Sequence, residues 1–151
     1  MAKSYKRTIT LGLDYSDFTG GVQKCNAAMK KLDAEFAYAN ECLKKDGTES
    51  EKLSLKKEQL TQKINVQKQM VENAKKKYDN LAGSLGYAAK ETEKADAELL
   101  KQRTTLERLE NQLSYVDKEL IRVEYDTKEH RDKLEKLNAE YEYSNECLKE
   151  N

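Results

Sequence analysis

The sequence contains no proline and no tryptophan, and only six of its 151 residues are glycine. At an average usage of roughly 5%, about seven prolines would be expected, so long helices meet no interruption from this residue. Only two residues are phenylalanine, and the mean hydropathy is -1.00. Large apolar side chains are therefore too few for a thick core enclosed on several sides, which argues against an ordinary compact enzyme domain.

Positive and negative charges balance, because Lys with Arg and Asp with Glu each number 28. No net field attracts the chain to a polyanion, so we expect no nucleic acid partner. No segment reaches the roughly 20 apolar residues of a membrane span, and the start of the chain is too polar for a signal peptide. The sequence thus predicts a soluble protein without membrane contact in this segment.

Residues of the kinds that carry chemistry occur without the spacing that chemistry needs. The three cysteines show no metal-ligand spacing and are odd in number, so neither a zinc site nor a disulfide framework is expected. We interpret Cys42 and Cys147 as small apolar residues buried at helix seams. No glycine-rich phosphate loop is present, and no motif places a nucleophile beside the single histidine. We therefore expect no catalytic residue, metal site or cofactor, and no enzyme.

The first half of the chain predicts a short extended segment followed by two helices. Residues 7–13 alternate apolar and polar side chains, which indicates a strand within an extended segment at residues 1–15. Apolar positions then follow helical spacing from Phe18 to Leu43. We expect this helix and the next to form an antiparallel hairpin at residues 16–83. The apolar stripe of the second helix is Leu53, Leu60, Ile64, Val71, Ala74, Tyr78 and Leu81.

Glycines and a capping motif predict where these helices end. Gly47 offers a left-handed end to the first helix, with the turn near residues 46–48. Thr48 and Glu51 have the form of a capping box at the start of the second helix. The second helix is expected to end at the glycines Gly83 and Gly86.

Residues 87–151 contain no glycine and predict one long coiled-coil helix, which would reach about 90 Å over some 60 residues. A strict seven-residue repeat gives this helix a single seam. Its members are Leu106, Leu109, Leu113, Val116, Leu120, Val123, Thr127, His130, Leu134, Leu137, Tyr141, Ser144 and Leu148. Thr127 and His130 form a polar layer that either sets the register and responds to pH or is merely tolerated. The seam fits an intrachain hairpin, a dimer or a trimer, within an elongated all-α fold.

One segment of the chain occurs twice. Leu32–Asp46 and Leu137–Asn151 lie 105 residues apart and are identical at nine of fifteen positions. Self-similarity at a fixed period is typical of a chain built from repeats. The counterpart of Gly47 would be residue 152, so the sequence stops just short of its next expected turn, and we expect it to continue in a longer parent protein.

Several segments together resemble one protein family. The opening combines an extended stretch, a D-x-S-x-F turn at Asp14–Phe18 and a polar helix that contains Ala27–Leu32. Further segments that contribute to the resemblance lie in the coiled-coil portion, at Glu58–Ile64, Val71, Tyr78, Leu85-Gly86, Ala95–Leu99 and Leu106–Leu113. Over nearly its whole length, the chain thereby resembles the N-terminal region of tail tape measure proteins of long-tailed phages and prophages.

This resemblance implies a structural virion protein that lies in the lumen of the tail tube and sets its length during assembly in the host cytoplasm. It implies tail tube and assembly proteins as partners, besides self-association through the coiled coil. A helix suits a ruler because its axial rise is fixed, and 105 residues of continuous helix span about 158 Å. The alternative is a free-standing coiled-coil adaptor or scaffold that binds a partner helix along residues 106–148.

Overall fold

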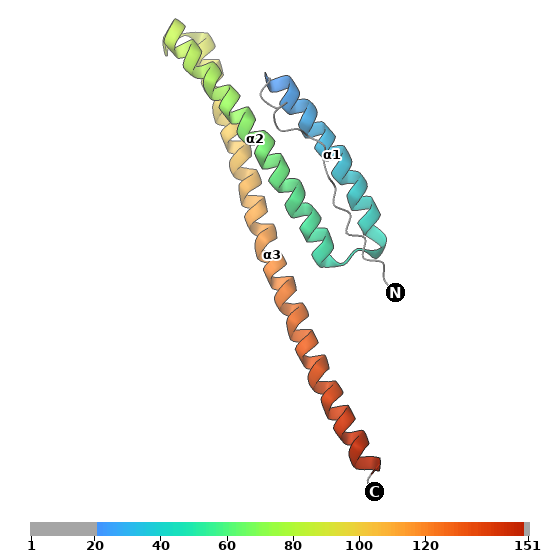
Figure 1. The fold of residues 1–151 in the computed structure, drawn as a ribbon. Coiled ribbons are helices and arrows are strands. Elements are labelled where there is room, and N and C mark those ends of the chain that lie inside the picture. Colours follow the sequence, from blue (N-terminus) through green and yellow to red (C-terminus); the bar gives the residue numbers. More distant parts are fainter. Residues whose placement is uncertain (1–20, 150–151) are drawn as a thin grey trace.

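The computed structural model describes residues 21–149, which are helical apart from two short connections (Figure 1). Its three helices are α1 (Gly21–Asp46), α2 (Glu49–Leu85) and α3 (Lys90–Lys149). The prediction of an all-α fold is confirmed, since the described residues contain no strand. The strand expected at residues 7–13 and the rest of the segment 1–15 lie outside the described residues.

The three helices run back and forth beside one another, with α2 in the middle (Figure 1). α2 packs against α1 on one side and against α3 on the other, while α1 and α3 do not approach each other within residues 21–149. Both neighbouring pairs are antiparallel because each connection is only a short turn. α3 has 60 residues and α2 has 37, so α3 extends far past the start of α2 and the molecule is elongated.

The connection between α1 and α2 is closed by reciprocal hydrogen bonds. The Glu51 backbone N–H donates to the Thr48 hydroxyl at 3.2 Å, and the Thr48 backbone N–H donates to the Glu51 carboxylate at 2.8 Å. The predicted capping box is thus present at the start of α2. It satisfies two backbone donors that the helix itself leaves without partners.

Gly47 serves this turn in a different way from the one expected. The prediction of a left-handed conformation is wrong, because among the described residues only Gly21 and Gly86 have a positive φ. The Gly47 N–H instead donates to the Leu43 carbonyl at 3.0 Å, and a Cβ at this position would lie 2.6 Å from that oxygen. Glycine is therefore needed here for the close approach of two backbone segments.

The second connection is built around Gly86, which has a φ of 86° and donates its N–H to the Ala82 carbonyl. Gly83 lies inside the last turn of α2, so the helix ends only at the second of the two expected glycines. The fully buried Thr92 hydroxyl donates to the Gly86 carbonyl at 2.8 Å. This hydrogen bond ties the first turn of α3 to the end of α2.

α2 carries two apolar faces, one for each neighbour. Leu55, Val66 and Met70 pack against α1, whereas Leu60 and Ile64 pack against α3. The stripe that α1 buries in return consists of Cys25, Ala28, Leu32 and Phe36. Full burial of one large apolar side chain contributes about 1.5–3 kcal/mol. The helices are therefore held together along two thin seams instead of around one common core.

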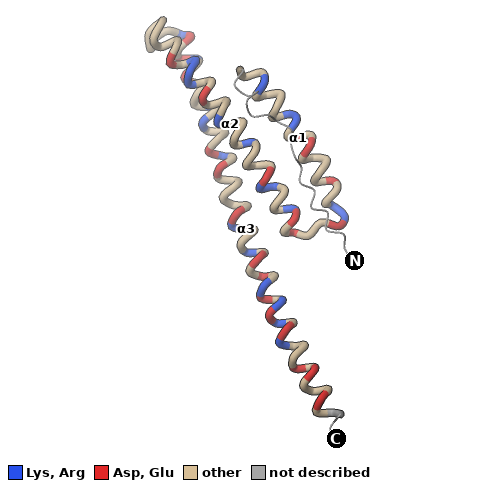
Figure 2. The backbone as a smooth tube through the Cα atoms, viewed as in Figure 1, with Lys and Arg blue, Asp and Glu red and all other residues tan. Residues whose placement is uncertain are grey.

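Charged residues of both signs occur along all three helices (Figure 2). Some of them bridge neighbouring helices: the Lys63 ammonium contacts the Asp33 carboxylate of α1, and Lys57 Nζ lies 2.7 Å from Asp117 Oδ1 of α3. Partly exposed ion pairs of this kind contribute little to stability. They do show which residues of neighbouring helices lie at the same level.

Candidate interaction surface

The predicted seam of α3 divides into a covered half and an exposed half. Leu109 and Val116 are buried against α2, and Val123 is still partly buried. The other partly buried members of this half are Leu106, Leu113 and Leu120. From residue 106 to residue 123 the seam is therefore part of the intrachain pair of α2 and α3, which is one of the arrangements that its sequence allows.

The covered seam begins earlier in α3 than the leucine pattern indicates. Thr92, Ala95 and Leu99 are buried, and with Gln102 they precede Leu106 at the same alternating steps of three and four. The leucine pattern did not assign these positions to the seam, because only Leu99 among them is a large apolar residue. Extension of the heptad register toward the N-terminus would have found them.

A buried glutamine contact interrupts this seam. Gln67 of α2 is 2% exposed, and its Nε2 donates to the Gln102 backbone carbonyl at 3.0 Å and to Gln102 Oε1 at 2.7 Å. A slip of one helix along the other would leave the Gln67 amide without partners in an apolar environment. The contact therefore sets the register of α2 against α3. The spacing of α2 could have indicated Gln67, because it fills the gap between Ile64 and Val71 in the alternating steps of three and four, but its polar side chain kept it out of the predicted apolar stripe.

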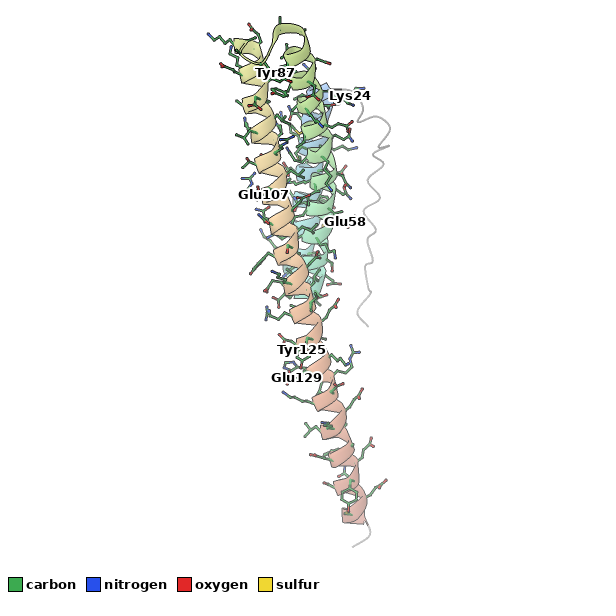
Figure 3. All side chains as sticks on the ribbon, turned by 90° about the vertical axis from the view of Figure 1, so that its left-hand side faces the viewer. Lys24, Glu58, Tyr87, Glu107, Tyr125 and Glu129 are labelled. Carbon is green, nitrogen blue, oxygen red and sulfur yellow. The ribbon has the colours of Figure 1, made fainter. Side chains whose placement is uncertain are left out.

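Past residue 126, α3 continues beyond the start of α2 as a single helix, which we call the tail (residues 127–149; Figures 1 and 3). Tyr125 and Glu129 mark its beginning in Figure 3. The tail face is the set of seam positions on this helix: Thr127, His130, Leu134, Leu137, Tyr141, Ser144 and Leu148. Leu134, Leu137 and Tyr141 are 60%, 61% and 68% exposed, and no other described helix reaches them. An apolar stripe at heptad spacing on an unpaired helix marks an interaction surface.

Thr127 and His130, the expected polar layer, are exposed on the tail. The Thr127 hydroxyl donates to a backbone carbonyl one turn back, and His130 Nδ1 lies 2.8 Å from the Asp126 carbonyl. Close by, Lys133 Nζ lies 2.7 Å from Glu129 Oε1. This hydrogen-bonded pair lowers the pKa of Glu129 and raises the pKa of Lys133. A pH response of the seam at His130 stays a prediction.

The prediction that Cys42 and Cys147 are buried at helix seams is wrong, because both side chains are exposed. Neighbouring helix positions differ by about 100° around the axis, so the apolar stripe of α1 that includes Leu43 does not include Cys42. The buried cysteine is Cys25, which packs between α1 and α2. Burial raises the pKa of its thiol, since the thiolate would lose its hydration there.

The described chain also has open grooves and single exposed apolar side chains, among them Leu100, Tyr115 and Ile121. A shallow groove of about 550 Å³ runs between α2 and α3, and its lining includes Lys56, Glu107 and Arg108. Within residues 21–149, no group of three or more His, Cys, Asp or Glu side chains is arranged to hold a metal ion. None of the described helices is long and apolar enough to span a bilayer. The tail face is therefore the candidate functional surface.

Comparison of the chain with protein family models, curated proteins and solved structures finds no match. The resemblance to tape measure proteins consequently depends on the sequence segments that carry it, from Asp14–Phe18 to the coiled-coil residues. The tail face and the internal repeat are properties of the chain itself, and they hold whatever its family.

Proposed function

We propose that the chain is the N-terminal part of a phage tail tape measure protein and acts structurally, without catalysis, in setting the length of the tail tube. The observation that carries the proposal is α3, a single helix of 60 residues that ends in a second copy of an α1 segment. A helix of that length reaches about 90 Å, and a repeated segment supplies a fixed increment of length. The sequence resemblance described above supports the same family.

On this proposal the chain acts in the lumen of the tail tube, after assembly in the host cytoplasm. Its partners are tail tube and assembly proteins and other helices. α2 already covers the α3 seam at residues 106–123, so self-association through this seam would use the tail face. The balanced charges along the helices (Figure 2) produce no strong field of one sign that would hold the protein to a charged tube wall.

Duplication of one period in the phage tests this function. Residues 33–137 make up one period of 105 residues, and their duplication keeps both repeated segments intact. We expect tails that are longer by one uniform step, measured by electron microscopy of the particles. Deletion of the same residues is the reciprocal variant and should shorten the tails by the same step. Tails of unchanged length in both strains would refute a measuring role for this region.

The exposed tail face supports a second candidate, a free-standing coiled-coil adaptor or scaffold that binds a partner helix. An exposed apolar stripe is what such a protein presents to its partner. The partner would cover the tail only, and not the whole stripe from residue 106 to residue 148, because α2 covers its first half. The period duplication separates the candidates, since an adaptor needs no fixed length. A coding sequence that runs on with further heptads past codon 151 favours the ruler, and a stop codon favours the adaptor.

A further inference from the structure

The tail face and the buried face of α1 are two copies of one sequence pattern. Leu32 and Phe36 of α1 correspond to Leu137 and Tyr141 of the tail, 105 residues further along. The correspondence continues on both sides, where Met29, Ala39 and Leu43 match Leu134, Ser144 and Leu148. Leu32 and Phe36 are fully buried, whereas Leu137 and Tyr141 are 61% and 68% exposed. The same pattern is thus covered in one copy and open in the other.

The molecule itself shows which kind of helix covers this pattern. α2 follows α1 after a two-residue turn, returns antiparallel to it, and packs Leu55, Val66 and Met70 onto the α1 stripe. The ion pair of Lys63 with Asp33 lies between the same two helices. The helix that covers the first copy of the pattern is therefore antiparallel and amphipathic, with apolar residues spaced as Leu55, Val66 and Met70 are in α2.

We propose that the tail face seats a second helix of the α2 type, antiparallel to the tail, so that the tail serves as the α1 of a following structural unit. In such an arrangement, α3 packs on the α2 of its own unit through residues 92–123 and on the next helix of that type through residues 134–148. One continuous helix thereby links two units without a break. This proposal concerns how the fold propagates and does not depend on a role in a phage tail.

Two substitutions between the copies limit where the second helix docks. His130 and Lys133 stand in the tail where α1 has the buried residues Cys25 and Ala28. Burial of the Lys133 ammonium without its partner would be costly. Lys133 lies at the edge of the tail face and pairs with Glu129, so its long side chain keeps the charge in water while a helix docks beyond it. The apolar contact therefore begins at residue 134.

Addition of one period to the full chain tests this proposal. A copy of residues 47–151 joined after Asn151 continues the 105-residue period and supplies an α2-type helix together with its own α3. Lys136→Arg in the added copy distinguishes its peptides by mass. Amide hydrogen exchange of residues 134–147 in the original copy is then compared with that of the 151-residue chain. We expect this segment to exchange more slowly in the extended chain, by a factor of about ten or more, because docking protects its helix from opening.

Two tyrosines of the tail provide matched variants. Tyr141 and Tyr143 are 68% and 70% exposed, so replacement of either by lysine disturbs no packed contact of the chain as it stands. They point in different directions, because two residues correspond to about 200° around a helix. Tyr141→Lys in the original copy should abolish the added protection, and Tyr143→Lys should leave it intact.

Three results would overturn the proposal. The first is unchanged exchange of residues 134–147 after addition of the period. The second is an added protection that survives Tyr141→Lys. The third is tail-to-tail pairing: if the unmodified chain sediments as a dimer that Tyr141→Lys dissociates, the tail face binds a second tail and not a helix of the α2 type. A monomeric chain that gains protection only with the added period supports the proposal.

Discussion

Phe36→Ala and Tyr141→Ala alter equivalent positions of the two repeat copies, and we expect them to differ sharply in effect. Phe36 is fully buried between α1 and α2, whereas Tyr141 is 68% exposed. Truncation of a buried phenylalanine costs about 3–5 kcal/mol, while a surface substitution usually changes stability by less than about 0.5 kcal/mol. α1 contacts only α2 among the described helices, so the loss in Phe36→Ala falls on the docking of α1.

Alkylation of Cys25 measures that docking directly. Cys25 belongs to the same buried cluster as Phe36, and burial raises the pKa of its thiol, so a reagent reaches a reactive thiolate only after α1 opens. At about 1.4 kcal/mol per tenfold change, a loss of about 3 kcal/mol raises the open fraction roughly 100-fold. We expect iodoacetamide to label Cys25 faster by about this factor in Phe36→Ala. The exposed Cys42 serves as the internal reference.

Tyr141→Ala is the matched control for this experiment. It should leave both the labelling rate of Cys25 and the urea midpoint close to those of the unmodified chain, since Tyr141 contributes little to the fold of the isolated chain. The reasoning would be refuted by equal effects of the two substitutions. It would also be refuted if Cys25 were labelled no faster in Phe36→Ala, because α1 docking would then not depend on its buried stripe.

Three further predictions concern the register, the turn and the tail. Gln67→Ala removes the buried partner of Gln102 and should cost about 1–3 kcal/mol in urea denaturation, and leucine at both positions should recover most of that loss. Gly47→Ala places a Cβ 2.6 Å from a carbonyl oxygen and should cost about 1–3 kcal/mol in the same assay. The hydrogen bond with Lys133 lowers the pKa of Glu129. The ionised carboxylate therefore stabilises the tail fully above the ordinary glutamate pKa, and this stabilisation is lost as the pH falls through the lowered value. Lys133→Ala should return the pKa of Glu129 toward its usual range in an NMR titration.

Each of these predictions has a result that contradicts it. An unchanged urea midpoint in Gln67→Ala would mean that the glutamine contact does not hold the register of α2 against α3. Unaltered stability of Gly47→Ala would show that the turn relaxes without cost. A pKa of Glu129 that stays lowered in Lys133→Ala would assign the shift to another cation, for which His130 is the nearby candidate.

The helix ends could be predicted from sequence because the interactions that define them are local. The capping box joins Thr48 to Glu51, three residues away, and the helix end at Gly86 needs only the positive φ that glycine allows. For Gly47 the sequence predicted the place of the turn but not the backbone conformation of the glycine. Its role depends on how closely the turn brings its backbone to Leu43, which no residue preference reveals.

The partner of each apolar face could not be predicted, because periodicity gives the direction of a face and not what covers it. The seven-residue repeat of α3 is continuous from residue 106 to residue 148, yet its first half is covered by α2, and the positions from residue 127 to residue 144 are exposed. The second face of α2 was missed for a related reason. Leu55, Val66 and Met70 are few and widely spaced beside a stronger stripe on the same helix, so only the packing of α1 identifies them as a face.

The ion pairs between helices give the distance along the molecule between the first repeat copy, in α1, and the second copy, in α3. Asp33 of α1 lies level with Lys63 of α2. On the other side of α2, the pairs that flank Lys63 are Lys57 with Asp117 and Lys68 with Glu110. Asp33 is therefore level with a position on α3 between residues 110 and 117. Its sequence counterpart, residue 138, lies 21 to 28 residues beyond that position, or roughly 32–42 Å along the helix axis.

This stagger gives the proposed ruler two distinct step lengths. A period that keeps the folded arrangement advances roughly 32–42 Å, whereas the same 105 residues opened into a continuous helix advance about 158 Å. A short step in the duplication strain would require the tail face to be covered as the buried face of α1 is, by a helix of the α2 type. A long step would require both seams of α2 to open, which exposes Phe36 and breaks the Gln67 contact, so the tube lumen would have to stabilise the extended chain by at least that loss.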